Sequence, residues 1–120
     1  MEFYRCKECG SIVVKVTEGK GAHCGENLEK LTANTVDAAT EKHVPEISVE
    51  GHLVTVKVGS VEHPMLEAHY IEFIALETTA GVHYKTLKPG EAPVAKFVLD
   101  EGEEVLHAYE FCNLHGLWMA

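Results

Sequence analysis

From residue 41 onward, the chain is a succession of short extended runs, each closed by a turn signal. In residues 53–58 three valines alternate with other side chains, and the run stops at Gly59. Residues 82–87 alternate again and end at the strong turn sequence Lys88-Pro89-Gly90-Glu91. About six such strands, without a sustained helical stripe, predict an all-β fold, either an antiparallel sandwich or a barrel.

The first 30 residues differ from the rest in composition. They hold three of the four cysteines and four of the ten glycines, with one convincing strand at residues 12–16. A segment this small cannot bury much apolar surface, so it usually needs a metal, a disulfide or a partner chain to stay folded. Residues 31–40 are predicted to form a helical turn or a structured connector.

Charge and length exclude several classes of function. The 120 residues include 10 Lys and Arg against 19 Asp and Glu, a formal net charge of −9. This acidity argues against nucleic-acid and anionic-membrane partners. No apolar run approaches the length of a membrane span, and the N-terminus does not read as a secretory signal. We therefore predict a cytoplasmic protein with reduced thiols, whose 8 His and 4 Cys indicate metal chemistry.

The most informative segment lies near the C-terminus. Cys112 and His115 stand in Cys-x-x-His spacing just after a predicted strand, which lets one metal ion take both a thiolate and an imidazole. An isolated pair of this kind is more often a buried cysteine beside an unrelated loop histidine. Further ligands elsewhere in the chain are needed to favour a site.

Three histidines lie where loops can supply such ligands: His43, His63 and His69. Pro64 biases His63 away from helical geometry, and each histidine taken singly is more often an ordinary surface residue. As a set with the Cys-x-x-His pair they offer four imidazoles and one thiolate. Five such ligands do not suit a closed tetrahedral zinc site, and they leave iron and copper open.

Several strings along the chain carry a family resemblance. They are Glu41-Lys42-His43-Val44-Pro45, Val58-Gly59-Ser60-Val61-Glu62-His63-Pro64-Met65, His69-Tyr70-Ile71-Glu72, Leu87-Lys88-Pro89-Gly90 and Cys112-Asn113-Leu114-His115-Gly116-Leu117-Trp118. In this order they resemble the desulfoferrodoxin-type superoxide reductases, and the resemblance covers nearly the whole chain.

The resemblance implies an immunoglobulin-like antiparallel β-sandwich over residues 37–120, preceded by a small desulforedoxin-like β segment over residues 1–36. It also implies a mononuclear non-haem iron with four equatorial histidines and an axial cysteine. Carried over by position, the ligands are His43, His63, His69, His115 and Cys112. Glu41 matches the carboxylate that takes the sixth position of ferric iron, and Lys42 matches the cation beside the open position.

The activity implied by the resemblance is the one-electron reduction of superoxide to hydrogen peroxide, with re-reduction by a rubredoxin-like electron donor. The family also implies a homodimer or higher homo-oligomer. Superoxide is an anion, and a body of charge −9 repels it. Fe(II) with four neutral imidazoles and one thiolate keeps a charge of about +1, and Lys42 adds another, so a local field can overcome the global one. The alternative is a non-catalytic electron-transfer or metal-binding module with a closed coordination sphere.

The N-terminal segment departs from the family pattern. Cys6 and Cys9 form a Cys-x-x-Cys knuckle, but His23 stands beside Cys24 where two-iron relatives have a second cysteine pair. A rubredoxin-like iron centre is therefore not expected. Three interpretations stay open: zinc or iron bound by Cys6, Cys9, His23 and Cys24, a knuckle without metal, or redox-active surface thiols.

Overall fold

The computed structural model describes residues 1–19 and 27–120. These residues divide into two compact units, Met1–Thr32 and Ala33–Ala120, which are described separately. The domain boundary implied after residue 36 stays a prediction. His23 and Cys24 lie outside the described residues.

The first unit contains a three-stranded antiparallel sheet of order β2-β1-β3. Its strands are β1 (Glu2–Cys6), β2 (Ile12–Lys15) and β3 (Leu28–Lys30). Of these, only the strand at β2 was predicted, because β1 and β3 lack its run of β-branched residues. Glu2 forms ion pairs with Lys15 at 2.6 Å and Lys30 at 3.0 Å, which tie the three strands together.

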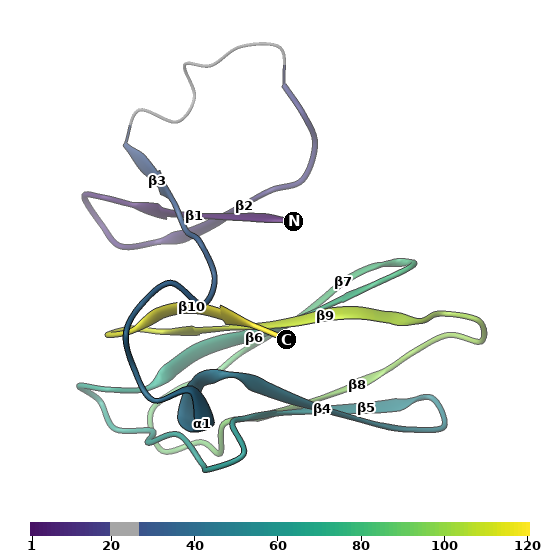
Figure 1. Ribbon diagram of the computed structural model, residues 1–120. Helices are drawn as coiled ribbons and strands as arrows, with labels where there is room; N and C mark the ends of the chain where they lie inside the picture. Colours follow the sequence, from purple (N-terminus) through teal and green to yellow (C-terminus); the bar gives the residue numbers. More distant parts are fainter. Residues whose placement is uncertain (20–26) are drawn as a thin grey trace. The chain divides into compact units, whose positions relative to one another are not determined.

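The second unit is an antiparallel sandwich preceded by one helical turn (Figure 1). Its elements are α1 (Thr40–His43), β4 (Pro45–Glu50), β5 (Leu53–Val58), β6 (Ile71–Thr78), β7 (Gly81–Thr86), β8 (Val94–Val98), β9 (Val105–Cys112) and β10 (Gly116–Met119). One sheet has the order β10-β9-β6-β7 and the other the order β4-β5-β8. The predicted all-β sandwich is therefore confirmed.

The alternation seen in the sequence explains the core of this sandwich. Val54, Val56 and Val58 of β5 are at most 1% exposed, because every second side chain of a strand faces the same side. They pack in one apolar cluster with residues of the other sheet, including Ile74 and Cys112. The cysteine of the predicted site is thus anchored in the core itself.

The remaining expectations concern helices and connectors. Residues 31–40 are largely irregular, with a turn at 33–34 and bends at 36 and 38, and a helical turn begins only at Thr40. Strand β10 occupies a segment whose sequence signal was interpreted as metal chemistry rather than as a strand. Among the described residues, no helix is long and apolar enough to cross a membrane.

Candidate metal centre

The first histidine, His43, closes the single turn of α1. The turn ends there because Val44 precedes Pro45, and a residue before proline is biased towards extended geometry. The ring Nδ1 of His43 lies 2.7 Å from the carbonyl oxygen of Ala39, to which it donates. The side chain is 2% exposed, so this bond fixes the ring of a buried histidine.

The second histidine, His63, follows the loop after β5. Its backbone N–H donates to the carbonyl of Val58 at 2.9 Å, which folds the loop back on the end of the strand. Its Nδ1 lies 2.7 Å from the carbonyl oxygen of Pro64, to which it donates. His63 is also 2% exposed, so a backbone carbonyl orients each of the two most buried rings.

The loop that carries His63 also supports α1. The backbone N–H of Val61 donates to the carbonyl oxygen of Glu41 at 2.9 Å, and the Ser60 hydroxyl donates to the same oxygen at 3.3 Å. A Cβ atom at Gly59 would lie 2.7 Å from that oxygen and 2.9 Å from the carbonyl oxygen of Val44. Only glycine therefore allows α1 to pack this closely against the loop.

Cys112 and His115 lie in a tight hairpin between β9 and β10. Cys112 pairs with Gly116, whose φ of +80° favours glycine and lets the chain reverse direction. The indole N–H of Trp118 donates to the carbonyl oxygen of His115 at 3.0 Å. The Cys112 Sγ lies 3.9 Å from the Nδ1 of His115, and the cysteine is fully buried.

Asn113, inside this hairpin, holds the segment that carries His69. Its Oδ1 accepts the backbone N–H of Tyr70 at 2.9 Å, and its Nδ2 donates to the carbonyl oxygen of Ala68 at 3.1 Å. The side chain thus binds the backbone on both sides of His69. No role of Asn113 was predicted from its residue type, and the one signal in the sequence was its place between two candidate ligands.

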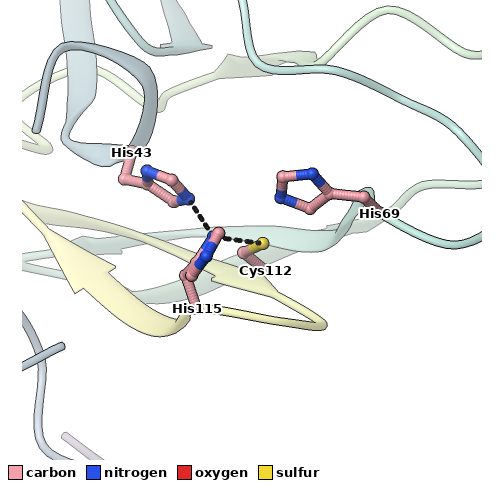
Figure 2. Close-up of side chains that lie close together, drawn as sticks. All are labelled: His43, His69, Cys112 and His115. Carbon is pink, nitrogen blue, oxygen red and sulfur yellow. Dashed lines mark hydrogen bonds between the residues drawn. The ribbon is translucent and has the colours of Figure 1, made fainter. Parts of the chain in front are cut away.

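The four histidines form a closed ring of imidazoles. Neighbouring ring centroids lie 4.7 Å apart for His43 and His63, 4.6 Å for His63 and His69, 5.1 Å for His69 and His115, and 4.8 Å for His115 and His43. Neighbouring planes meet at 78–87°. Figure 2 draws three of these rings with the thiol of Cys112. The ligand atoms of His43, His69, Cys112 and His115 all lie within 4.8 Å of one another.

The hydrogen-bond pattern of the ring fits a bound cation. Because His43 and His63 donate through Nδ1, each neutral ring presents a lone pair at Nε2, and these two nitrogens lie 3.2 Å apart. The Nε2 of His43 also lies 3.1 Å from the Nδ1 of His115. The Nε2 of His69 is buried without a hydrogen-bond partner among the described residues. Lone pairs that face each other at this distance repel. A metal ion bound by these nitrogens would remove that repulsion and would give the Nε2 of His69 a partner.

Burial favours the neutral form of the imidazoles, which is the form that binds a metal. Desolvation lowers the pKa of His63 to about 4 and also lowers the pKa values of His43 and His69. These three imidazoles are therefore neutral at pH 7. Burial raises the pKa of the Cys112 thiol, so a cation is needed to hold it as thiolate.

Glu110, two residues before Cys112, is a second residue that sequence reasoning missed. It is fully buried, and neither carboxyl oxygen has a hydrogen-bond partner among the described residues. Burial raises its pKa well above the usual range, which favours the uncharged acid.

Glu41 and Lys42 occupy the exposed turn of α1 next to His43. After burial and the charge of His115, the charge of Lys42 is the third cause of the lowered pKa of His69. Lys42 also lines an open cavity of about 540 Å³ together with His63. Both charged residues thus lie beside the ring, while their roles stay predictions.

The second predicted site is only partly described. Cys6 and Cys9 carry free thiols at the end of β1. The Sγ of the exposed Cys9 lies 3.1 Å from the hydroxyl oxygen of Ser11, and this contact is the main reason that the pKa of the thiol is lowered to about 7. A metal site that includes His23 and Cys24 stays a prediction, because both lie outside the described residues.

Known proteins resemble this chain over its whole length. The family profile described as desulfoferrodoxin matches residues 35–120. The chain belongs to the desulfoferrodoxin family. A desulfoferrodoxin homologue of Archaeoglobus fulgidus is 46% identical, covering 100% of this chain and 96% of its own. A desulfoferrodoxin of Syntrophotalea carbinolica is also 46% identical, covering 98% and 94%.

A solved structure extends the likeness to three dimensions. The crystal structure of the superoxide reductase from Treponema pallidum is 42% identical and aligns with a TM-score of 0.81, covering 99% of this chain and 97% of that one. The four histidines and the buried thiol described above therefore belong to a desulfoferrodoxin fold. They form a His/Cys metal site of the kind typical of superoxide reductase iron.

Proposed function

We propose that this desulfoferrodoxin is a superoxide reductase that converts superoxide to hydrogen peroxide at one non-haem iron. The single observation that carries the proposal is the closed ring of four near-perpendicular imidazoles beside a buried thiol. The iron ligands are His43, His63, His69, His115 and Cys112. The resemblance to a solved superoxide reductase supports the same substrate.

The donor set favours iron over the other metals. Structural zinc takes four ligands in a closed tetrahedron, whereas here four neighbouring imidazoles form a closed ring and a buried thiol lies beside it. Blue copper sites use two histidines and one cysteine. Iron would be held by the four imidazoles and the thiolate together. When bound, iron supplies the single electron that the reduction of superoxide consumes.

The protein's own residues prepare the site. The carbonyls of Ala39 and Pro64 hold the rings of His43 and His63 with Nε2 directed inward. Cys112 contributes its sulfur from the apolar core, where water does not reach the thiolate. Geometry fixed before the substrate arrives reduces the reorganisation needed during the reaction.

Lys42 and Glu41 act at the exposed side of the site. Lys42 supplies a positive charge next to the ring in a chain of net charge −9, so it attracts the anionic substrate locally. Ordered water held by its ammonium group delivers protons to the reduced product. Glu41 would offer a carboxylate to a bound metal from the same exposed side, and an electron donor of the rubredoxin type would supply the electrons that the reaction consumes.

The Lys42 role has a direct test. Lys42→Ala is expected to slow superoxide reduction by about tenfold at low ionic strength and to weaken its salt dependence, because steering by a local charge is screened by salt. Lys96→Ala, which removes an exposed lysine of β8, is the matched control and is expected to retain both properties. Stopped-flow decay of superoxide at several salt concentrations measures them. Equal effects of the two substitutions would contradict the local role.

Metal analysis and spectroscopy test the proposal as a whole. The purified protein is expected to contain one iron per chain, to gain a thiolate-to-ferric band on oxidation and to consume superoxide catalytically when a reductant is present. Azide or cyanide is expected to shift the band, since an enzyme needs an open position. A protein that is coloured but neither binds anions nor consumes superoxide would instead be the electron-transfer module.

Two further properties belong to the same proposal. The free thiols of Cys6, Cys9 and Cys112 suit a reducing compartment, so we infer a cytoplasmic location. The small sheet of the first unit has little apolar surface of its own, so we infer a homodimer or higher homo-oligomer. Sedimentation of the purified chain measures its oligomeric state.

A further inference from the structure

The turn that carries Cys6 and Cys9 brings two free thiols together. The backbone N–H of Gly10 donates to the carbonyl oxygen of Cys6 at 2.9 Å, which closes the turn around Cys9. Gly10 has a φ of +77°, a conformation that glycine adopts without strain. Only two residues separate Cys6 from Cys9, and both cysteines line one cavity, so the turn places the two thiols beside the same open space.

This thiol pair is accessible and lies among polar groups. Cys9 is exposed, and its sulfur lies 3.1 Å from the Ser11 hydroxyl oxygen. An open cavity of about 450 Å³ is lined by both cysteines, by the cations Arg5 and Lys7 and by the carboxylates of Glu8 and Glu29. A hydrogen bond donated by the Ser11 hydroxyl favours the thiolate, which is the reactive form of cysteine. Cys112, the other described cysteine, is fully buried.

A tetrathiolate metal centre does not fit the first unit. The chain has four cysteines in all, and Cys112 lies in the core of the second unit. Three thiolates at most are therefore left for the first unit of one chain. Among the described residues, the only group of three or more close metal-binding side chains is the one that contains His43.

We propose that Cys6 and Cys9 are a peroxide-oxidised dithiol that closes to a reversible disulfide. The Cys9 thiolate attacks one oxygen of hydrogen peroxide, the O–O bond breaks, and hydroxide leaves as Cys9 becomes a sulfenic acid. The Cys6 sulfur then attacks the sulfur of Cys9, the S–O bond breaks and water leaves. In sum, two thiols and one hydrogen peroxide give one disulfide and two waters, and two electrons pass from sulfur to oxygen.

The biological source of this oxidant rests on the proposed function, because hydrogen peroxide is the product of superoxide reduction. The dithiol then consumes part of what the same chain releases. A cellular dithiol reductant restores the pair by thiol–disulfide exchange.

The experiment uses the full-length chain with its metal content measured. The protein is reduced, freed from reductant, exposed to added hydrogen peroxide and alkylated, and its tryptic peptides are then weighed. Trypsin cleaves after Arg5 and Lys7, so Cys6 and Cys9 fall in different peptides. We expect these two peptides to be joined by a disulfide, and dithiothreitol to separate them again. Peroxide is added directly, so failure of superoxide reduction leaves this result unaffected.

Matched variants identify the pair. Cys24→Ser keeps both described thiols and is expected to form the same disulfide. Ser11→Ala removes the hydroxyl beside Cys9 and is expected to slow the reaction by about fivefold, the factor that one ordinary hydrogen bond is worth. Cys6→Ser is expected to stop at a sulfenic acid that dimedone labels on Cys9.

Three results would overturn the proposal. In the first, Cys6 and Cys9 stay fully alkylatable after peroxide treatment. In the second, the disulfide disappears in Cys24→Ser, which would assign the bond to Cys24. In the third, a metal ion held by Cys6 and Cys9 protects both thiols from peroxide.

Discussion

The described part of the chain contains two short turns that begin with cysteine, and they have opposite environments. Cys112 and His115 lie in a hairpin whose cysteine is fully buried and whose histidine adjoins three more imidazoles. Cys6 and Cys9 have the same three-residue spacing, but Cys9 is exposed and its nearest described side-chain partner is a serine hydroxyl. Spacing alone therefore does not decide between metal chemistry and thiol chemistry. Burial and the groups brought in from other segments decide it.

The largest difference is expected from removing one cysteine of each turn. Cys112→Ser should lower the rate of superoxide reduction by more than about 100-fold. Loss of a residue that only hydrogen bonds to a metal ligand lowers activity by about 10–100-fold, and loss of a ligand itself should lower it further. It should also remove the visible ferric band. Cys6→Ser is the matched variant and should change neither property. Stopped-flow kinetics and absorption spectra measure both, and a coloured, active Cys112→Ser protein would refute the ligand assignment.

The residues inside the two turns provide the next test. Asn113→Ala removes both hydrogen bonds that hold the backbone around His69, so we expect iron affinity to fall by about 10–100-fold. Asn113→Asp keeps the acceptor for Tyr70 and should lose less. Ser11→Ala, in the other turn, should leave iron affinity unchanged. Competition with an iron chelator measures the affinity. An equal loss of iron affinity in Asn113→Ala and Ser11→Ala would contradict a specific role of Asn113 at the metal centre.

Glycine matters in each unit for a different reason. Gly59→Ala places a Cβ 2.7 Å from the carbonyl oxygen of Glu41, so overpacking should cost about 1–3 kcal/mol of stability and displace α1 from the metal centre. Gly10→Ala forces alanine to a φ of +77°, which should cost about 1–2 kcal/mol. Urea unfolding measures both costs. Superoxide reduction should fall in Gly59→Ala alone, and an unaltered rate there would mean that α1 tolerates the shift.

The smallest effect concerns one carboxylate in each unit. Hydrogen bonds from Lys15 and Lys30 lower the pKa of Glu2 to about 2, and hydrogen bonds from Thr78, His83 and the Asp100 backbone lower that of Glu103 to about 2. Both pKa values are depressed by folding, so each group stabilises the fold above pH 4.5, its ordinary value, and loses that contribution as the pH falls towards 2.

Glu2→Gln and Glu103→Gln should each flatten the dependence of stability on pH in this acid range. The partners of Glu2 are exposed or half-exposed lysines, so added salt should weaken its contribution, whereas two of the three partners of Glu103 are neutral donors. Thermal unfolding at several pH values and salt concentrations measures the difference. An equal salt response in the two variants would contradict this account.

Much of the fold was predictable because strand periodicity is local. The alternating valines of β5 predicted both the strand and its buried face, which the structure confirms. Strand β10 was not predicted, since its four residues pair with β9 in a hairpin that no short window reveals. The strands β1 and β3 were also missed, because partners far along the chain stabilise them rather than their own apolar pattern.

The candidate site divides in a similar way. The identities of the histidines and of Cys112 were readable from ordered motifs that resemble a known family. The support of His69 by Asn113 was not readable, because hydrogen bonds between residues 43 and 45 positions apart follow from chain topology. The same holds for the burial of Glu110, whose polar side chain gives no sign in the sequence that it lies in a core.

By itself, the sequence determined which atoms are available: four imidazoles and a thiolate from one set of motifs, and an incomplete set of cysteines in the first unit. The tertiary structure alone decided how those atoms meet. Packing of α1 on the Gly59 loop and of the two sheets on each other brings the imidazoles together. Backbone carbonyls accept hydrogen bonds from Nδ1 of His43 and His63 and thereby leave Nε2 of each ring directed inward. The physical reason is that a side chain can bind a metal only when it is correctly oriented and shielded from water. Both its orientation and its burial depend on neighbours that are distant in sequence.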